Sequence, residues 1–290
     1  MKKEVYAKSL YEDNATDYSD LLEAVGEAFR ESIRQIMNRI GFTNGMKVLD
    51  VGAGIGHDLI DIAAAVAPDG MVTGLEIAEP HFIKAKRNAE LSGHSAKIRM
   101  LHCDLFSLDQ SKLYDIIWCN TTIACFLDPL EGLVKMNSLL KEGGKVVVIN
   151  DLCPMHWLPG ILLGQDRARE SRLYSAIFEN LKQHRRMRRK ECGVAIQHDA
   201  SCAGLMQLAD FHRLESRTAV AEEAGQLSEP LMKVMQLFLQ RSFSDRTKKY
   251  LSEEDRKFVN KISDPDSAFY LLKRRDLHII KPITSLIGYR

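Results

Sequence analysis

The stretch from Val48 to Gly56, VLDVGAGIG, constrains the fold of this chain more than any other. It predicts a short buried strand that carries one acid, Asp50, and is followed by three glycines at alternate positions. A helical pattern begins directly after the last glycine. Glycines in such a turn allow unusual backbone dihedrals and leave no Cβ to block a ligand. The first free N–H groups of the helix face the same place. The stretch therefore predicts a turn that a small molecule approaches closely.

The glycine spacing separates two kinds of nucleotide site. The dinucleotide fingerprint has the form G-x-G-x-x-G. In this chain the third glycine falls one position earlier, and Asp50 precedes the turn. Both details disfavour a nicotinamide or flavin dinucleotide. A plain tight turn between a strand and a helix is the remaining alternative.

Strand and helix patterns alternate over the first half of the chain. Apolar residues recur at helical spacing over Leu21–Ile40, and Gly41 ends that helix. The alternation of strands and helices predicts a parallel sheet covered on both faces. The predicted strands are Lys47–Val51, Met71–Glu76, Ile98–His102, Tyr114–Cys119 and Lys145–Asn150, and the helices between them are His57–Val66, Pro80–Leu91 and Pro129–Leu140.

The second half follows another rhythm. Residues 152–210 have mostly helical patterns, and two or three helices are expected within 228–274. The last two strands are predicted at Phe211–Val220 and Leu277–Ile287. The fold class is therefore α/β: a Rossmann-like, seven-stranded, mostly parallel sheet with helices on both faces and a helical cap. We expect residues 1–150 to form an N-terminal lid and a binding core. Residues 151–290 would add the cap insertions and the last two strands of the same sheet.

Three polar residues follow the ends of the predicted strands. Glu76 ends the second strand, where a carboxylate accepts hydrogen bonds from ribose hydroxyls in dinucleotide folds. Asp104 follows the third strand, and its carboxylate suits an adenine amine while Leu105 packs on the ring. Asn120 follows the fourth strand, which adjoins the first at the switch point. Helix capping and turn formation are the alternative roles for each.

These segments, in this order over residues 48–120, resemble the motifs of class I S-adenosylmethionine (SAM) methyltransferases. The resemblance covers residues 20–150 best. It implies that SAM is the cofactor and S-adenosylhomocysteine the product, with the ribose at Glu76, the adenine at Asp104 and Leu105, and the N-terminal segment as a lid. The family's adenine-N6 signature is absent, because Thr121 and Thr122 follow Asn120. The residues expected to contact SAM are Asp50, Gly52, Ala53, Gly54, Gly56, Glu76, Ile77, Asp104, Leu105, Asn120 and Tyr18.

The composition of the chain narrows the range of binding partners to expect. With 40 basic and 39 acidic side chains, the net charge of +1 gives no general attraction to nucleic acid or to an anionic membrane. No apolar run is long enough for a bilayer, and the polar start of the chain lacks a secretory signal. The six cysteines form no C-x-x-C pair, so a reduced, cytoplasmic protein without a metal site is expected. The basic run Lys182–Lys190 suits a solvated helix face or an anionic partner.

The acceptor side is less well defined by the sequence. His156 and His278 are the candidates for a catalytic base, because each lies near the expected end of a strand. We expect methyl transfer to an O, N or C nucleophile of a small molecule. The alternatives are an RNA or protein methyltransferase, a non-catalytic SAM-binding protein and, more remotely, a nicotinamide dehydrogenase. A homodimer is left open.

Overall fold

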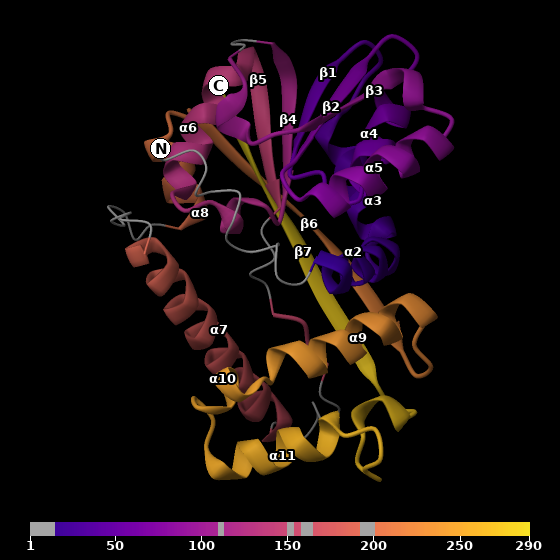
Figure 1. The fold of residues 1–290 in the computed structure, drawn as a ribbon, viewed down its shortest axis with the longest axis vertical. Coiled ribbons are helices and arrows are strands. Elements are labelled where there is room, and N and C mark those ends of the chain that lie inside the picture. Colours follow the sequence, from indigo (N-terminus) through magenta and orange to yellow (C-terminus); the bar gives the residue numbers. More distant parts are fainter. Residues whose placement is uncertain (1–14, 110–112, 150–153, 158–164, 192–200) are drawn as a thin grey trace.

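The computed structural model describes residues 15–109, 113–149, 154–157, 165–191 and 201–290 (Figure 1). Its centre is a seven-stranded sheet with the order β3-β2-β1-β4-β5-β7-β6. The first five strands run parallel, and β7 is antiparallel to both of its neighbours, β5 and β6. The strands are β1 (Lys47–Val51), β2 (Met71–Glu76), β3 (Ile98–His102), β4 (Tyr114–Asn120), β5 (Leu140–Ile149), β6 (Arg213–Ala224) and β7 (His278–Tyr289).

Helices cover both faces of this sheet, as predicted. One face packs against α3 (Arg30–Ile40), α4 (His57–Val66) and α5 (Glu79–Leu91). The other packs against α6 (Pro129–Leu139) and α8 (Cys202–Leu208). The remaining helices are α2 (Ala15–Ala28), α7 (Gln165–Glu191), α9 (Glu229–Ser242), α10 (Asp245–Lys248) and α11 (Glu253–Ser263). The predicted α/β fold with a helical cap is confirmed.

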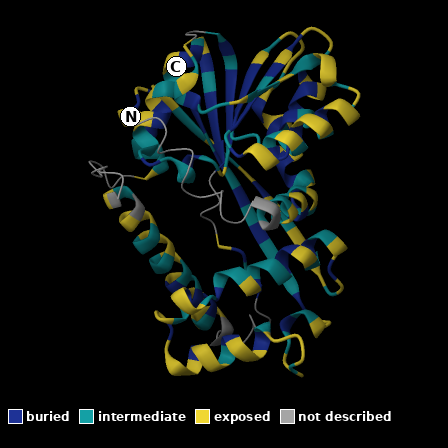
Figure 2. Ribbon diagram, in the orientation of Figure 1, coloured by how far each residue is buried: buried dark blue, intermediate teal, exposed yellow. Residues whose placement is uncertain are grey.

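Two apolar cores explain why the strands contain such continuous apolar runs. Successive side chains of a strand point to opposite faces of the sheet. Val48 therefore belongs to the core under α3 and α4, and Leu49 to the core under α6 and α8. In the same way Ile116 and Ile117 enter opposite cores, and all four side chains are fully buried. Figure 2 shows the resulting buried centre of the sheet.

The strands β6 and β7 extend past the rest of the sheet as a two-stranded ribbon. They pair over their whole length, from Arg213 opposite Tyr289 to Ala224 opposite His278. β6 ends later than the sequence predicted, at Ala224, because the first residues of β7 pair with it beyond the end of β5. β7 ends two residues later than predicted, at Tyr289, where it still pairs with Lys145 of β5. In Figure 1 the ribbon runs down to α9. Both strands lie in the same sheet as β1–β5, whereas the proposed division at residue 150 falls outside the described residues.

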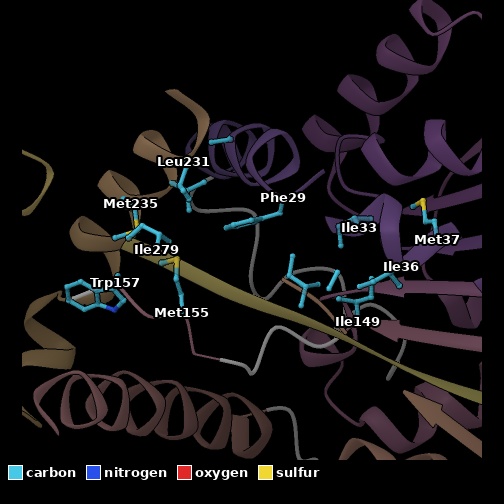
Figure 3. Close-up of a cluster of buried hydrophobic side chains, with 14 of the residues drawn as sticks. Phe29, Ile33, Ile36, Met37, Ile149, Met155, Trp157, Leu231, Met235 and Ile279 are labelled. Carbon is cyan, nitrogen blue, oxygen red and sulfur yellow. The ribbon is translucent and has the colours of Figure 1, made fainter. Parts of the chain in front are cut away.

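The first predicted helix is divided in two. The expected helix over 21–40 appears as α2 and α3, which meet at Phe29, with φ −110° and ψ 6°. Figure 3 shows Phe29 between Ile33 and Ile36 of α3 and Leu231 of α9. Burial of the Phe29 ring between α3 and α9 accounts for the break. The break directs α2 toward α9, and α2 packs against that helix.

We predict that Ile36→Ala lowers the free energy of unfolding by about 2–5 kcal/mol, because truncating a fully buried isoleucine leaves a cavity. The neighbouring Gln35 is exposed, so Gln35→Ala should change it by less than about 0.5 kcal/mol. Urea denaturation of both variants checks this. Equal effects would show that α3 does not pack against the sheet as described.

Candidate cofactor site

A cavity lies outside the carboxyl ends of β1, β2, β3 and β4, which is where open α/β sheets bind ligands. Residues from the first half of the chain surround it, as far as the described residues show. They are Leu22, Val25 and Gly26 of α2, then Asp50–Ile55, His57, Asp58, Leu75–Ile77, His81, Cys103–Phe106, Asn120–Thr122, Cys125 and Phe126. All of the predicted SAM contacts except Gly56 and Tyr18 are among them.

The glycine turn has the backbone that its sequence requires. Gly52, Gly54 and Gly56 have φ values of 73°, 55° and 91°, in the left-handed region that favours glycine. A Cβ on Gly52 would lie 2.3 Å from Oγ1 of Thr122, so no other residue fits. A Cβ on Gly56 would lie 3.3 Å from Cα of Ala85 in α5. Gly56 thus lets α4 and α5 approach each other closely, whereas Gly52 and Gly54 line the cavity.

The carboxylate of Glu76 connects the glycine turn to the end of β2. Its Oε2 accepts a hydrogen bond of 2.8 Å from the N–H of Gly54, and its Oε1 accepts one of 2.8 Å from the N–H of Ala78. Burial raises the pKa of this carboxyl, and the backbone N–H groups oppose the rise. Each oxygen keeps a further lone pair. Glu76 is therefore a fixed acceptor on the cavity wall that can receive two ligand hydroxyls.

A second carboxyl group, Asp50, lies deeper in the site. Its side chain is 2 % exposed, and its Oδ2 has no hydrogen-bond partner among the described residues. Burial raises the pKa of Asp50 well above its ordinary value, and the charges of Asp58 and Glu76 raise it further. An unpartnered buried oxygen is costly in a folded protein. The site therefore contains an acceptor that a bound ligand can satisfy.

The end of β4 forms another part of the wall. Asp58 accepts hydrogen bonds of 2.8 Å from Nε1 of Trp118 and from Nδ2 of Asn120. Asn120 lines the cavity as predicted, with its amide held in place by this bond. Thr121 follows with a φ of 54°, which is strained for a side chain of this type. Such strain is concentrated at binding and catalytic sites.

The loop after β3 forms the opposite wall. Oδ1 of Asp104 accepts hydrogen bonds from the N–H of Ser107 at 2.8 Å and from its hydroxyl at 3.0 Å. Leu105 is 3 % exposed and lines the cavity beside Phe106, whose ring meets that of Phe126 edge-on. An apolar wall next to a carboxylate suits a flat ring that carries an amine. Ile77 completes this side, at the end of β2.

The helix α2 forms a further wall of the cavity. Leu22, Val25 and Gly26 line it, and a Cβ on Gly54 would lie 3.6 Å from Cδ1 of Leu22. Tyr18 does not line the cavity, and its ring instead lies 5.1 Å from the guanidinium of Arg241 in α9. The remainder of the predicted N-terminal lid, residues 1–14, lies outside the described residues.

The two histidines chosen from the sequence lie elsewhere. His156 forms a bridge with Ile280 of β7, and its Nδ1 is 2.8 Å from Glu170. His278 begins β7, and its Nε2 is 2.6 Å from Glu222. Neither lines the cavity. Both were placed from the expected strand ends. The start of β7 does lie toward the carboxyl end of β5, but β5 ends opposite Ser285, and the ribbon of β6 and β7 carries His278 well past that end of the sheet.

The structure brings two other histidines to the cavity, His57 and His81. Nε2 of His57 is buried without a hydrogen-bond partner among the described residues. A Cβ on Gly26 would lie 2.4 Å from Cδ2 of this ring, so only glycine lets α2 pack there. Burial, helped by the charge of Arg30, lowers the pKa of His57. Its position directly after Gly56 was the available sequence signal.

Known proteins with this pattern settle the family. A family model described as "Methyltransferase domain" matches residues 42–213, which is more than half of the chain. The chain belongs to the methyltransferase domain family. This confirms the resemblance to class I SAM-dependent methyltransferases, the enzyme class and the SAM cofactor. It also favours a methyltransferase over a nicotinamide dehydrogenase.

Curated proteins of known name are similar to this methyltransferase. It is 30% identical over 122 residues to the demethylmenaquinone methyltransferase of Staphylococcus aureus, which is 42% of this chain and 49% of the relative. The chain therefore spans about half the length of the curated relatives it matches.

Solved structures support the fold. The YcgJ protein of Bacillus subtilis is similar at a TM-score of 0.52 and 13% identity, over 90% of this chain and 98% of that one. Phosphoethanolamine N-methyltransferase 2 of Haemonchus contortus, bound to phosphomonomethylethanolamine and S-adenosylhomocysteine, is similar at 0.51 and 13%, over 97% of this chain and 60% of that one.

The buried His57 predicts an acid-dependent stability. Its pKa is lowered in the fold, so below the ordinary value of 6.5 the unfolded chain binds a proton that the folded chain does not. Stability is therefore lost as the pH falls. We expect the melting temperature to drop less between about pH 8 and about pH 5.5 in His57→Gln than in the unaltered protein.

The exposed His212 supplies the control, because His212→Gln should keep the pH dependence of the unaltered protein. Calorimetric melting of the three proteins at both pH values is the measurement. An unchanged pH dependence in His57→Gln would contradict the buried, neutral imidazole.

Proposed function

We propose that this chain transfers the methyl group of SAM to an O, N or C nucleophile of a small molecule. The observation that carries the proposal is the Glu76 carboxylate, fixed beside the glycine turn on the wall of the cavity. Glu76 would accept the ribose hydroxyls of SAM. Asp104 and Leu105 would hold the adenine, and the turn from Gly52 would contact the rest of the cofactor.

The side chains also fit the charge of this cofactor. SAM, when bound, supplies a methyl group made reactive by a positively charged sulfur. Asp50, with an unpartnered buried oxygen, and Asp58 provide negative charge in the same cavity. Leu22 and Val25 of α2 form an apolar part of its wall. With a reactive methyl group, alignment and exclusion of water supply most of the catalysis, so the chain's main contribution is positioning.

A general base is needed only if the group that receives the methyl carries a proton of high pKa. His57 is better placed for this role than His156 or His278, because it lines the cavity. Its lowered pKa keeps the ring neutral at physiological pH, and a neutral imidazole accepts a proton. Asn120 and the strained Thr121 would position the acceptor beside it.

A small acceptor is proposed over RNA or protein on two grounds. The helix α2 forms one wall of the cavity and packs against α9, which confines the space beside the glycine turn. The names of two relatives, a demethylmenaquinone and a phosphoethanolamine methyltransferase, belong to enzymes with small acceptors. No helix among the described residues is long and apolar enough to span a bilayer. A cytoplasmic location and a homodimer stay predictions from the sequence.

The function is tested by following the methyl group. The protein is incubated with methyl-labelled SAM together with the small-molecule, the RNA or the protein fraction of cells, each in a separate reaction. We expect label in the small-molecule fraction with an equal amount of S-adenosylhomocysteine. Label only in RNA or protein would overturn the small acceptor, and SAM binding without any S-adenosylhomocysteine would identify a non-catalytic binder.

A further inference from the structure

The basic run of α7 forms one face of the helix. Lys182, Arg185, Arg186 and Arg189 follow each other at positions i, i+3, i+4 and i+7, which lie on one side of an α-helix. The side chain of Lys182 pairs with Glu179 at 3.6 Å. The three arginines continue this face toward the carboxyl end of the helix. We call Arg185, Arg186 and Arg189 the arginine face.

The arginine face is attached to the cavity wall. Nε of Arg189 donates a hydrogen bond of 2.8 Å to the carbonyl oxygen of Leu127. Leu127 follows Cys125 and Phe126, both of which line the cavity. One end of the face is therefore held next to the segment after β4 that forms the wall. In Figure 1 the carboxyl end of α7 lies on the side of the sheet covered by α6 and α8.

Among the residues whose side chains the structure describes, no acid forms an ion pair with Arg185, Arg186 or Arg189. Burial and the neighbouring charge of Arg185 lower the pKa of Arg189, while Asp128 opposes them. The carboxylate of Asp128, however, already caps α6 by accepting from the N–H groups of Leu130 and Glu131. Like charges four residues apart destabilise a helix unless an anion lies between them.

We infer that the arginine face binds an anionic group, a phosphate, carried by the methyl acceptor. This inference rests on the proposed function and specifies its substrate class: a small phosphorylated molecule whose nucleophile reaches the cavity. Guanidinium groups recognise phosphate oxygens through paired, charge-assisted hydrogen bonds. A dianionic phosphate would also relieve the repulsion between the arginines.

A nucleic acid fits the same face less well. Single strands are bound by basic grooves in which aromatic rings alternate with the charges and stack on the bases. The run contains no Phe, Tyr or Trp, and its exposed apolar residue is Met187. The hydrogen bond of Arg189 to Leu127, next to the cavity wall, also suits a compact anion. A stabilised helix end remains the plain alternative, because cations favour the carboxyl end of a helix.

The test measures the binding of inorganic phosphate to the full chain loaded with S-adenosylhomocysteine. Binding is detected by 31P NMR, and chloride keeps the ionic strength constant. The variant Arg185→Gln/Arg186→Gln removes two exposed charges and keeps good helix formers. The control Lys249→Ala/Arg256→Ala removes two exposed charges near α10 and α11. We expect phosphate affinity to fall about tenfold in the first variant and to stay unchanged in the control.

The outcomes separate this inference from the proposed function. If S-adenosylhomocysteine binds but phosphate affinity is equal in all three proteins, the arginine face only stabilises the helix and the inference is overturned. If a short single-stranded RNA binds far more tightly than phosphate and loses affinity in the first variant, the partner is a nucleic acid and the inference also fails. If S-adenosylhomocysteine does not bind the unaltered protein, the proposed function itself fails.

Discussion

The site depends on one carboxylate that joins two backbone segments. Glu76 accepts the N–H of Gly54 with one oxygen and the N–H of Ala78 with the other. These bonds hold the glycine turn against the end of β2 and keep the carboxylate facing the cavity. Because charge-assisted bonds to backbone N–H groups are strong, the turn is ordered before a ligand arrives. A preorganised turn lowers the entropic cost of binding.

The same cavity concentrates negative charge. Asp50, Asp58 and Glu76 all line it, and burial raises the pKa of each. Carboxylates collected in a poorly solvated space repel one another and lose hydration, which costs stability. A cationic ligand with hydroxyl and ammonium donors reverses both costs. The electrostatics of the site therefore match a positively charged sulfur compound better than a dinucleotide with its phosphates.

The local elements of the core could be predicted from the sequence because short-range patterns determine them. The bounds of β1, β2, β3 and α4 agree with the prediction, since each apolar run is bounded by a turn. The bonds of Asn120 and Trp118 to Asp58 could not be predicted, because about 60 residues of chain separate each pair. The environment of His57 depends on Gly26 in another helix. For the same reason the sequence pointed to His156 and His278 at expected strand ends, and neither of them lines the cavity.

The most direct test of the cofactor site is calorimetric titration of S-adenosylhomocysteine into Glu76→Gln. The glutamine keeps the shape of the side chain but loses the charge and one acceptor, so we expect an affinity about 10- to 100-fold weaker. Glu79→Gln changes an exposed acid three residues away and should bind as the unaltered protein does. Equal affinity in Glu76→Gln and Glu79→Gln would contradict the account.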